Sequence, residues 1–222
     1  MSAIVLNEKS VIPTWINDNE SFCRWALSGN YPERGKVSYF KDKVWLDLSM
    51  EAEIHNWIKN AVLVVLSTLV SRRKLGRFYG DGMMMSSAAA ELSTEPDGMF
   101  VSTRRRKNGE VTVRGGKAVS GGAVILVGAP DMVVEVVRES SVRKDTVELV
   151  DLYWRAGVTE YWLFDPRPEN VRFTMSVAGP DGYRIVRPRD GWRKSTVFGA
   201  EFRLIQSVDE SDDLPTFAVQ VR

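Results

Sequence analysis

The chain has 222 residues, of which 44% are hydrophobic and 27% are charged, a composition typical of a folded globular domain and unlike that of a disordered chain. Its formal net charge of +1 provides no general attraction to nucleic acid, so such binding would need a local basic patch. Cys23 is the only cysteine and His55 the only histidine, which excludes an internal disulfide, a cysteine-based zinc cluster and a multi-histidine metal site.

We expect neither secretion nor membrane insertion, because the N-terminal residues lack a basic region followed by a long apolar one. The most apolar stretch, at 61–70, is too short and too closely flanked by charge to span a bilayer. The sequence therefore predicts a cytoplasmic protein with no membrane partner. The expected organisation is a single domain over residues 1–222, with a core at about 37–205, an irregular N-terminal arm and a C-terminal tail.

The segment that follows the N-terminal arm predicts a hairpin and then a helix. Residues 37–48 form two alternating runs of apolar and polar residues, which predict two strands that turn at Lys41 and Asp42. Ser49 is a plausible N-cap for the helix that follows, because apolar residues then recur at helical spacing. The expected apolar face consists of Ile54, Ile58, Ala61, Val62, Val65 and Leu69.

The middle of the chain predicts strands set off by glycine and proline. Short apolar runs occupy 76–85 and 96–102. The polar, glycine-punctuated segment 103–116 predicts an exposed loop or a protruding hairpin. The apolar and β-branched segment 123–137 predicts a pair of strands at the centre of a sheet.

A β-α-β unit is expected next. Asp145 is placed as the N-cap of a helix over 146–156, with Glu148 completing a variant of the capping box. EYWLFD at 160–165 returns as a strand, which favours a right-handed crossover between two parallel neighbours. The remaining segments predict antiparallel strands on turns. The chain is therefore expected to form one α/β domain.

Two acids interrupt apolar strands. Alternate strand residues share a face, so Glu135 in PDMVVEVV points into the same layer as its apolar neighbours and needs a cation, a hydrogen bond or a raised pKa. Asp97 in EPDGMFV has similar surroundings. Carboxylates on adjacent strands would repel each other unless a divalent ion bridged them, and oxygen ligands suit Mg²⁺ or Mn²⁺. Lys144 could then place its charge near a phosphate or an attacking water. The alternative is an ordinary ion pair between Glu135 and an arginine across the sheet.

The segment 129–167 resembles the Uma-two family of restriction-endonuclease-like proteins, within the PD-(D/E)XK nuclease superfamily. The elements "APD.V.EV", "S...KD", "LY..AG" and "EYWL.D" occur there in order. The likeness extends more weakly to EIHNWI and EPDGMFV, over about 37–205. It implies an α/β, restriction-endonuclease-like fold with a mixed β-sheet flanked by helices, and it suggests a homodimer by analogy.

The resemblance also implies site roles. By position, Asp97 corresponds to the first metal-binding acid and Glu135 to the second, with Mg²⁺ or Mn²⁺ as cofactor. Glu51 or Glu53 could supply the further acid that some superfamily members carry. These members hydrolyse phosphodiester bonds of DNA, so the resemblance implies a DNA substrate.

The sequence departs from the pattern at the catalytic lysine. The position two residues after Glu135 is Val137, and the helix position that usually carries the lysine in this family is Leu149. Lys144 is the nearest substitute, since its long side chain could reach back toward Glu135. Arg138 is expected on the opposite strand face and is a poorer candidate.

Three functions stay open at this point. The first is a metal-dependent endonuclease that uses Asp97, Glu135 and Lys144, with the basic runs 104–107 and 72–74 on the phosphate backbone. The second is a catalytically inactive member of the fold that binds nucleic acid or a partner. The third is a small-molecule-binding α/β protein. His55 is expected to be a packing residue rather than a catalytic one.

Overall fold

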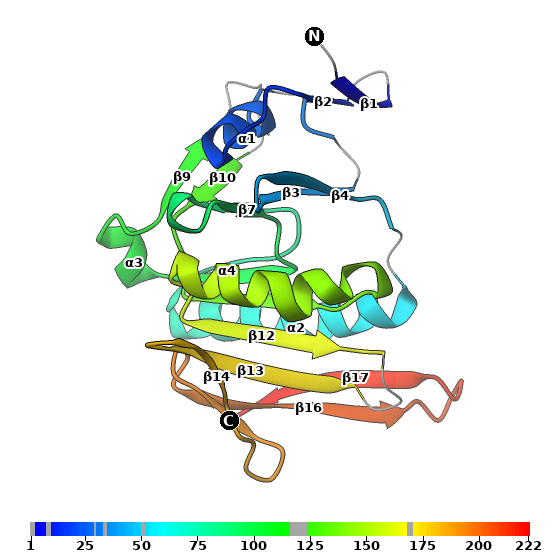
Figure 1. Ribbon diagram of the computed structural model, residues 1–222. Helices are drawn as coiled ribbons and strands as arrows, with labels where there is room; N and C mark the ends of the chain where they lie inside the picture. Colours follow the sequence, from blue (N-terminus) through cyan, green and yellow to red (C-terminus); the bar gives the residue numbers. More distant parts are fainter. Residues whose placement is uncertain are drawn as a thin grey trace.

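The structure is a computed structural model that describes residues 3–7, 10–28, 30–32, 35–49, 52–115, 124–167 and 171–222 (Figure 1). Its centre is a six-stranded mixed sheet, called the main sheet here, with the strand order β14-β13-β12-β11-β8-β5. β11 and β12 run parallel and the other neighbours are antiparallel. The strands are β5 (Gly76–Tyr79), β8 (Gly98–Ser102), β11 (Met132–Val136), β12 (Glu160–Asp165), β13 (Arg172–Gly179) and β14 (Gly182–Ile185).

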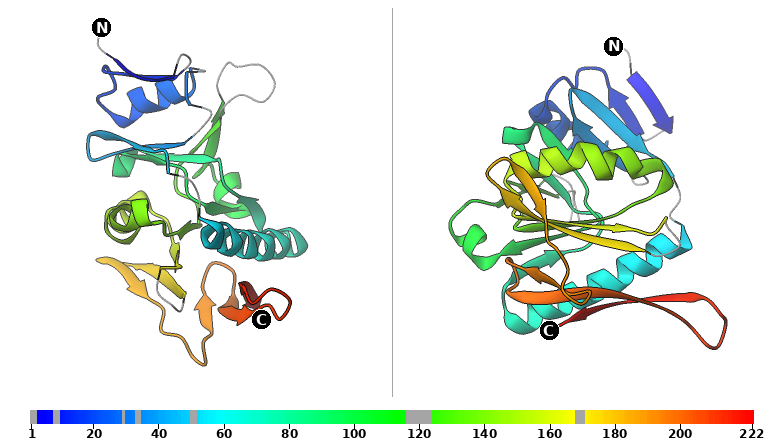
Figure 2. Two further views of the ribbon diagram at one scale, coloured as in Figure 1. Left: turned by 90° about the vertical axis from the view of Figure 1, so that its right-hand side faces the viewer. Right: turned by 60° about the horizontal axis from the view of Figure 1, so that its bottom comes forward.

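Two helices cover the two faces of the main sheet, α2 (Glu53–Arg73) and α4 (Leu149–Ala156) (Figure 2). The alternation of β11 explains the arrangement, since Val134 and Val136 pack on the α2 side and Val133 on the α4 side. The α2 side also buries Ile58, Val62, Leu66 and Trp162, and the α4 side Met99, Val101, Leu149, Leu152, Tyr153 and Tyr161. The fold is therefore the expected α/β class with a mixed sheet flanked by helices.

A second six-stranded sheet has the order β4-β3-β7-β6-β10-β9 and carries the N-terminal elements above it (Figure 1). Its hairpin was predicted correctly, because Lys41 and Asp42 have positive φ values of 52° and 56° between β3 and β4. Its strands are β3 (Lys36–Phe40), β4 (Lys43–Asp47), β6 (Met84–Ser87), β7 (Leu92–Thr94), β9 (Thr112–Gly115) and β10 (Val124–Val127).

The N-terminal region is more regular than predicted. It forms a hairpin of β1 (Ala3–Asn7) and β2 (Ser10–Pro13), followed by α1 (Asn19–Ala26). Asp18 caps α1 by accepting a hydrogen bond of 2.6 Å from the backbone nitrogen of Ser21. The buried Phe22 and Trp25 then anchor the helix on the second sheet. The expectation of irregular structure was wrong because these short elements are stabilised by tertiary packing.

The long helix α2 begins later than predicted. Its N-cap is Ala52, and the backbone nitrogen and hydroxyl of Ser49 bind Asp47 instead. By length and composition α2 would suit a membrane span, with a mean hydropathy of 1.2. Its buried face, however, packs on β5, β11 and β17. The predicted helix with one buried face is therefore confirmed, although that face also includes the polar residues His55 and Lys59.

The segments around β9 to β11 differ from expectation in two ways. Residues 103–107 form the short helix α3 (Thr103–Lys107), capped by the side chain of Ser102. β9 pairs antiparallel with β10, so this part of the segment predicted as an exposed loop or a hairpin within 103–116 belongs to the second sheet. β10 and β11 are not a pair, because the chain crosses from the second sheet to the main sheet at Gly128, whose φ of +107° requires glycine.

The β-α-β unit is confirmed, with one local change. β11 and β12 pair in parallel from Met132 opposite Glu160 onward. The connection from β11 to α4 contains a 3-10 turn, η2 (Glu139–Ser141), and a π-helical turn, η3 (Lys144–Glu148). Asp145 lies within the π-helical turn and is not an N-cap. A further 3-10 turn, η1 (Ala88–Ala90), lies between β6 and β7. Beyond β14, the C-terminal strands β15 (Arg193–Ser195), β16 (Ala200–Val208) and β17 (Pro215–Val221) form an antiparallel sheet against α2.

Candidate active site

The two predicted acids lie side by side at one end of the main sheet. In the antiparallel ladder of β8 and β11, Gly98 pairs with Val134, so Asp97 and Glu135 hold the next opposing positions. Residues opposite each other in such a ladder have Cβ atoms about 5 Å apart. The backbone nitrogen of Val136 donates a hydrogen bond of 2.8 Å to Oδ2 of Asp97. The structure therefore brings together two carboxylates that are remote in the sequence.

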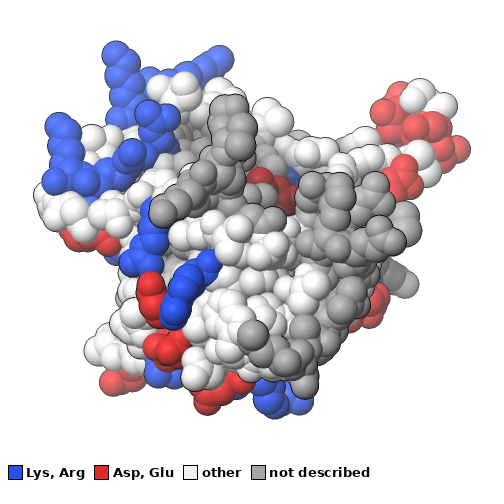
Figure 3. Space-filling model, turned by 90° about the horizontal axis from the view of Figure 1, so that it is seen from above, with Lys and Arg blue, Asp and Glu red and all other residues white. Residues whose placement is uncertain are grey.

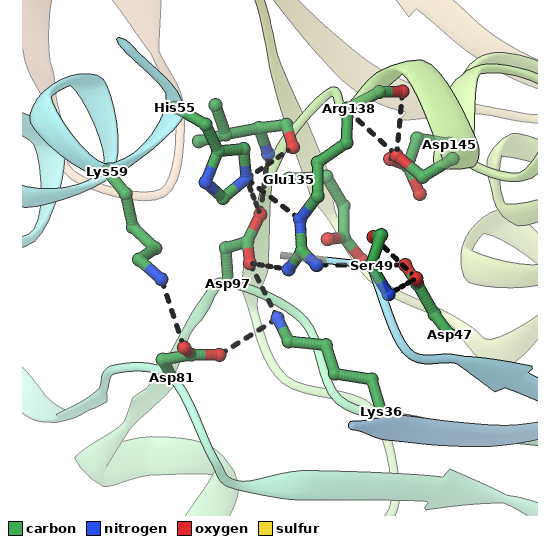
Figure 4. A network of polar contacts seen from close by, with 12 residues as sticks. Lys36, Asp47, Ser49, His55, Lys59, Asp81, Asp97, Glu135, Arg138 and Asp145 are labelled. Carbon is green, nitrogen blue, oxygen red and sulfur yellow. Dashed lines mark hydrogen bonds and ion pairs between the residues drawn. The ribbon is translucent and has the colours of Figure 1, made fainter. Parts of the chain in front are cut away.

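Asp97 is surrounded by positive charge (Figure 4). Nζ of Lys36 lies 2.7 Å from its Oδ1, and Nη2 of Arg138 lies 3.9 Å from the same oxygen. Nε2 of His55 lies 3.6 Å from its Oδ2. Burial opposes the charge of Asp97, but Lys36 and His55 outweigh it and hold the pKa of the carboxyl well below its usual value. Asp97 is therefore an ionised, buried carboxylate.

The surroundings of Glu135 raise its pKa, in contrast to those of Asp97. It is buried on the α4 side, where the hydroxyl of Tyr153 donates a hydrogen bond of 2.6 Å to its Oε1. Burial, followed by the charges of Asp145 and Asp97, raises the pKa of Glu135 to about 8, against the opposing effect of Lys144. Without further positive charge, Glu135 therefore retains a proton near neutral pH.

Asp145 is a third acid of the site and was missed by the sequence interpretation, which treated it as a helix cap. The π-helical turn directs its side chain inward, where Ser141 donates a hydrogen bond to Oδ2 and Oδ1 is buried without a hydrogen bond. Nζ of Lys144 lies 3.8 Å from Oδ1. Burial raises the pKa of Asp145 to about 6 despite Lys144. The motif KDT, which contains both Lys144 and Asp145, was the feature of the sequence that could have identified Asp145 as a site residue.

The predicted cation Lys144 lies on the Asp145 side of the site, with its side chain 14% exposed. Its charge acts on Glu135, Asp145 and Asp47. Lys36, on β3, was not predicted and makes the closer contact with the acid pair. Lys144 is therefore near the acids, but it is one of two lysines there.

Lys36 belongs to a row of alternating charges that crosses the site (Figure 4). Its Nζ lies 2.9 Å from Oδ1 of Asp81, in addition to its contact with Asp97. Nζ of Lys59, which is buried on α2, lies 3.1 Å from Oδ2 of Asp81. The order Lys59, Asp81, Lys36, Asp97 thus connects α2 to the acid pair.

Arg138 also differs from expectation. The alternation rule placed it on the face opposite to Glu135, but β11 ends at Val136 and the rule does not apply beyond that residue. Its guanidinium instead reaches Asp97 and lies 3.7 Å from Asp47. A pocket of about 340 Å³ opens beside it, lined by His55, Arg138, Arg167, Ser49 and Ser140 among others. The pocket meets the site at His55 and Arg138, whereas Asp97 and Glu135 are buried behind its lining.

The other acids of these segments and the expected lysine positions do not belong to the site. Asp131 accepts hydrogen bonds from the backbone and hydroxyl of Ser102 and pairs with Arg105, so it is structural. Glu53 is exposed at the start of α2, and Glu51 lies outside the described residues. Both expected lysine positions, Val137 and Leu149, are buried and apolar.

A divalent cation would find two buried carboxylates here rather than a complete set of protein ligands. Across the described residues, no group of three or more His, Cys, Asp or Glu side chains is close enough to hold a metal. Magnesium, however, is commonly held by one or two carboxylates, and water and phosphate complete its shell. The raised pKa of Glu135 and the unbonded Oδ1 of Asp145 indicate more acceptor oxygen than the surrounding donors satisfy. Asp97 and Glu135 therefore fit a hard cation as a two-ligand site.

The basic runs lie at the other end of the main sheet. Lys74, Arg77, Arg106 and Lys107 line a hollow of about 660 Å³ between α2 and α3. In Figure 3, blue side chains gather on that side of the molecule, whereas red ones cover a projection on the opposite side. Arg105 is used structurally, since it donates to the carbonyl oxygens of Ala129 and Gly157.

The family model described as "Putative restriction endonuclease" (Uma2) matches residues 20–204. The chain belongs to this family. The match contains both acids, the lysine on β3 and the whole β-α-β unit. It therefore supports a restriction-endonuclease-like character for the site at the end of β8 and β11.

A solved structure gives the same fold. The chain is similar to the crystal structure described as a putative nuclease belonging to DUF820 from Anabaena variabilis ATCC 29413, with 17% sequence identity and a TM-score of 0.59. The similarity covers 82% of this chain and 90% of that chain. No curated protein matches the sequence. The restriction-endonuclease-like fold predicted from the sequence is thus confirmed.

Proposed function

We propose that this protein is a metal-dependent nuclease that hydrolyses phosphodiester bonds of DNA. The observation that carries the proposal is that Asp97, which directly precedes β8, and Glu135 on β11 both lie one residue beyond the last ladder pair, Gly98 with Val134, and that Asp97 binds the backbone nitrogen of Val136. Family membership and fold support the nuclease class. Magnesium or manganese, when bound, would supply Lewis-acid polarisation of the phosphate and a more acidic water.

The protein's own side chains would bind and orient the substrate. Asp97 and Glu135 would hold the cation, and Glu135 would give up its proton as the cation binds. Arg138 lines the neighbouring pocket and would hold the phosphate through charge and hydrogen bonds, with His55 packed beneath its guanidinium. Lys144 would stabilise charge on the Glu135 side.

A second candidate is a non-catalytic member of the fold that binds DNA or a protein partner. The observation that favours it is that Val137 and Leu149, the two expected lysine positions, are both buried and apolar. In that case the acid pair and its cations would be a structural ion-pair network.

An assay of supercoiled DNA with Mg²⁺ or Mn²⁺ separates the candidates, with wild type, Asp97→Ala and Lys144→Ala measured together. Asp97→Asn serves as a companion variant of nearly the same shape. We expect metal-dependent nicking by the wild type and its loss in both Asp97 variants. Cleavage that survives in those variants would reject the site, and Mn²⁺ binding without cleavage by the wild type would favour the second candidate.

A further inference from the structure

We propose that Lys36 is the catalytic lysine of this site and replaces, from β3, the lysine that the helix position at Leu149 lacks. The inference rests on the proposed nuclease function. It assigns to Lys36 the stabilisation of negative charge on the substrate phosphate, next to Asp97.

The first argument is contact. Nζ of Lys36 lies 2.7 Å from Oδ1 of Asp97, whereas Nζ of Lys144 approaches no acid in the described part of the chain more closely than the 3.8 Å to Asp145. The charge of Lys36 also acts on Glu135, across the acid pair. An ammonium group in this position lies next to the carboxylate that would hold the cation, and so on the side where a phosphate bound to that cation would carry its charge.

The second argument is preorganisation. Lys36 is paired with Asp47 in the β3–β4 ladder, so its backbone is fixed by a hairpin. Asp81 binds the same ammonium at 2.9 Å and is itself held by Lys59 at 3.1 Å. Charge stabilisation by a group that is already oriented requires no rearrangement during the reaction. Asp81 and Lys59 are therefore positioning residues for Lys36.

The third argument is exposure. The Lys36 side chain is 14% exposed, so it is largely shielded from water yet reachable. The additional link to the more exposed Asp81, at 36%, gives Lys36 a partner that remains when a cation occupies Asp97.

The test compares Lys36→Met, Lys36→Arg and Asp81→Asn with the control Lys43→Met, an exposed lysine on the adjacent strand of the same hairpin. Nicking is measured at saturating Mn²⁺, Mn²⁺ affinity by calorimetry and folding by thermal melting. We expect Lys36→Met to lower the nicking rate by about 100-fold or more, as for loss of one preorganised donor. Its Mn²⁺ affinity should be equal to or greater than that of the wild type, because a cation next to Asp97 has been removed.

The remaining variants keep the test decisive. Lys43→Met should match the wild type, and Asp81→Asn should slow nicking at unchanged Mn²⁺ affinity. If Lys36→Met does not fold, Lys36→Arg takes its place, because it retains the positive charge but changes its position. Lys36→Arg should nick DNA at least about tenfold more slowly than the wild type.

Three results would overturn the inference. Nicking by a folded Lys36 variant at the wild-type rate, while Asp97→Asn is inactive, would remove Lys36 and leave the nuclease proposal intact. A tenfold loss of Mn²⁺ affinity in Lys36→Met would make Lys36 a structural support of the metal ligands. Absence of nicking by the wild type in either metal would instead overturn the proposed function and, with it, this role.

Discussion

The hydroxyl of Tyr153 donates a hydrogen bond of 2.6 Å to Oε1 of Glu135 and so joins α4 to the central strand β11. Both side chains are buried, and the phenol is the hydrogen-bonding partner of the carboxyl group. The contact therefore orients Glu135 and adds a buried hydrogen bond to the apolar packing that holds α4 on the sheet.

Removing this hydroxyl should destabilise the fold. Tyr153→Phe leaves a buried carboxyl oxygen without its donor, and we expect a loss of about 1–3 kcal/mol in the free energy of unfolding. Urea denaturation measures it. Tyr79→Phe is the matched control, because the Tyr79 hydroxyl binds the exposed Arg106 and should cost little. Equal effects of the two substitutions would contradict the importance of the buried bond.

The stability of the protein should depend on pH through Glu135. Burial and the neighbouring acids raise its pKa in the folded state to about 8, from an ordinary value of 4.5. The folded protein therefore binds more protons than the unfolded one between these values, so this contribution to stability is fully present below pH 4.5 and lost as the pH rises through about 8. The unfolding free energy of the wild type should fall from pH 5 to pH 8.5 relative to that of Glu135→Gln, which has no titrating carboxyl at this position. A constant difference would refute the assignment.

Binding of Mn²⁺ should release the proton that Glu135 carries near neutral pH. If Glu135 is a ligand, Mn²⁺ must displace its proton, and the affinity should rise about tenfold per pH unit below the pKa of about 8 and then level off. Calorimetry in buffers of different ionisation enthalpy counts the protons released. Release that persists in Glu135→Gln would assign the proton to Asp145 instead.

The basic hollow should contribute salt-dependent affinity for DNA. It lies roughly 28 Å from His55 along α2, by the helical rise, so a duplex reaching both would have to run beside that helix. Lys74→Glu combined with Lys107→Glu should weaken DNA binding and reduce the slope of log K against log salt by about 0.9 per lost phosphate contact. Lys194→Glu, exposed on β15, is the control. An unchanged slope would show that DNA does not contact the hollow.

Another buried acid, Glu160, should act on stability alone. It accepts hydrogen bonds from Trp162 Nε1, Ser195 Oγ, and the nitrogen and hydroxyl of Thr196, at 2.6 to 2.9 Å. Glu160→Ala leaves these donors unpaired and should cost about 4 kcal/mol or more. Thermal melting measures the loss, and Mn²⁺ affinity measured on the folded fraction should not change. A selective loss of Mn²⁺ binding would extend the metal site to β12.

The sequence was sufficient for the elements whose pattern is local. Alternation and helical spacing located the β3–β4 hairpin, α2 and the β-α-β unit, and the apolar surroundings of Asp97 and Glu135 marked them as unusual. Their meeting required only that two apolar strands be neighbours in one sheet.

The cations of the site could not be located in this way. Lys36 precedes Asp97 by 61 residues in the chain, and the contact depends on how the second sheet packs against the main sheet, which leaves no periodic signal. Arg138 was misplaced because strand alternation was extended past the end of β11. Lys144 was chosen because it is close to Glu135 in the sequence, and its Nζ lies 3.8 Å from Asp145 in the structure; Lys36 was not considered.

The π-helical turn ahead of α4 makes the composition of the site sensitive to the number of residues in the connection. Successive residues of an α-helix are separated by about 100° around the axis. Deleting Thr146 alone would convert the wide turn into an ordinary one and rotate everything before it by that angle relative to α4. Asp145 would then leave its present direction without any change in its identity. A single-codon deletion would thus alter the ligand environment more deeply than most point substitutions.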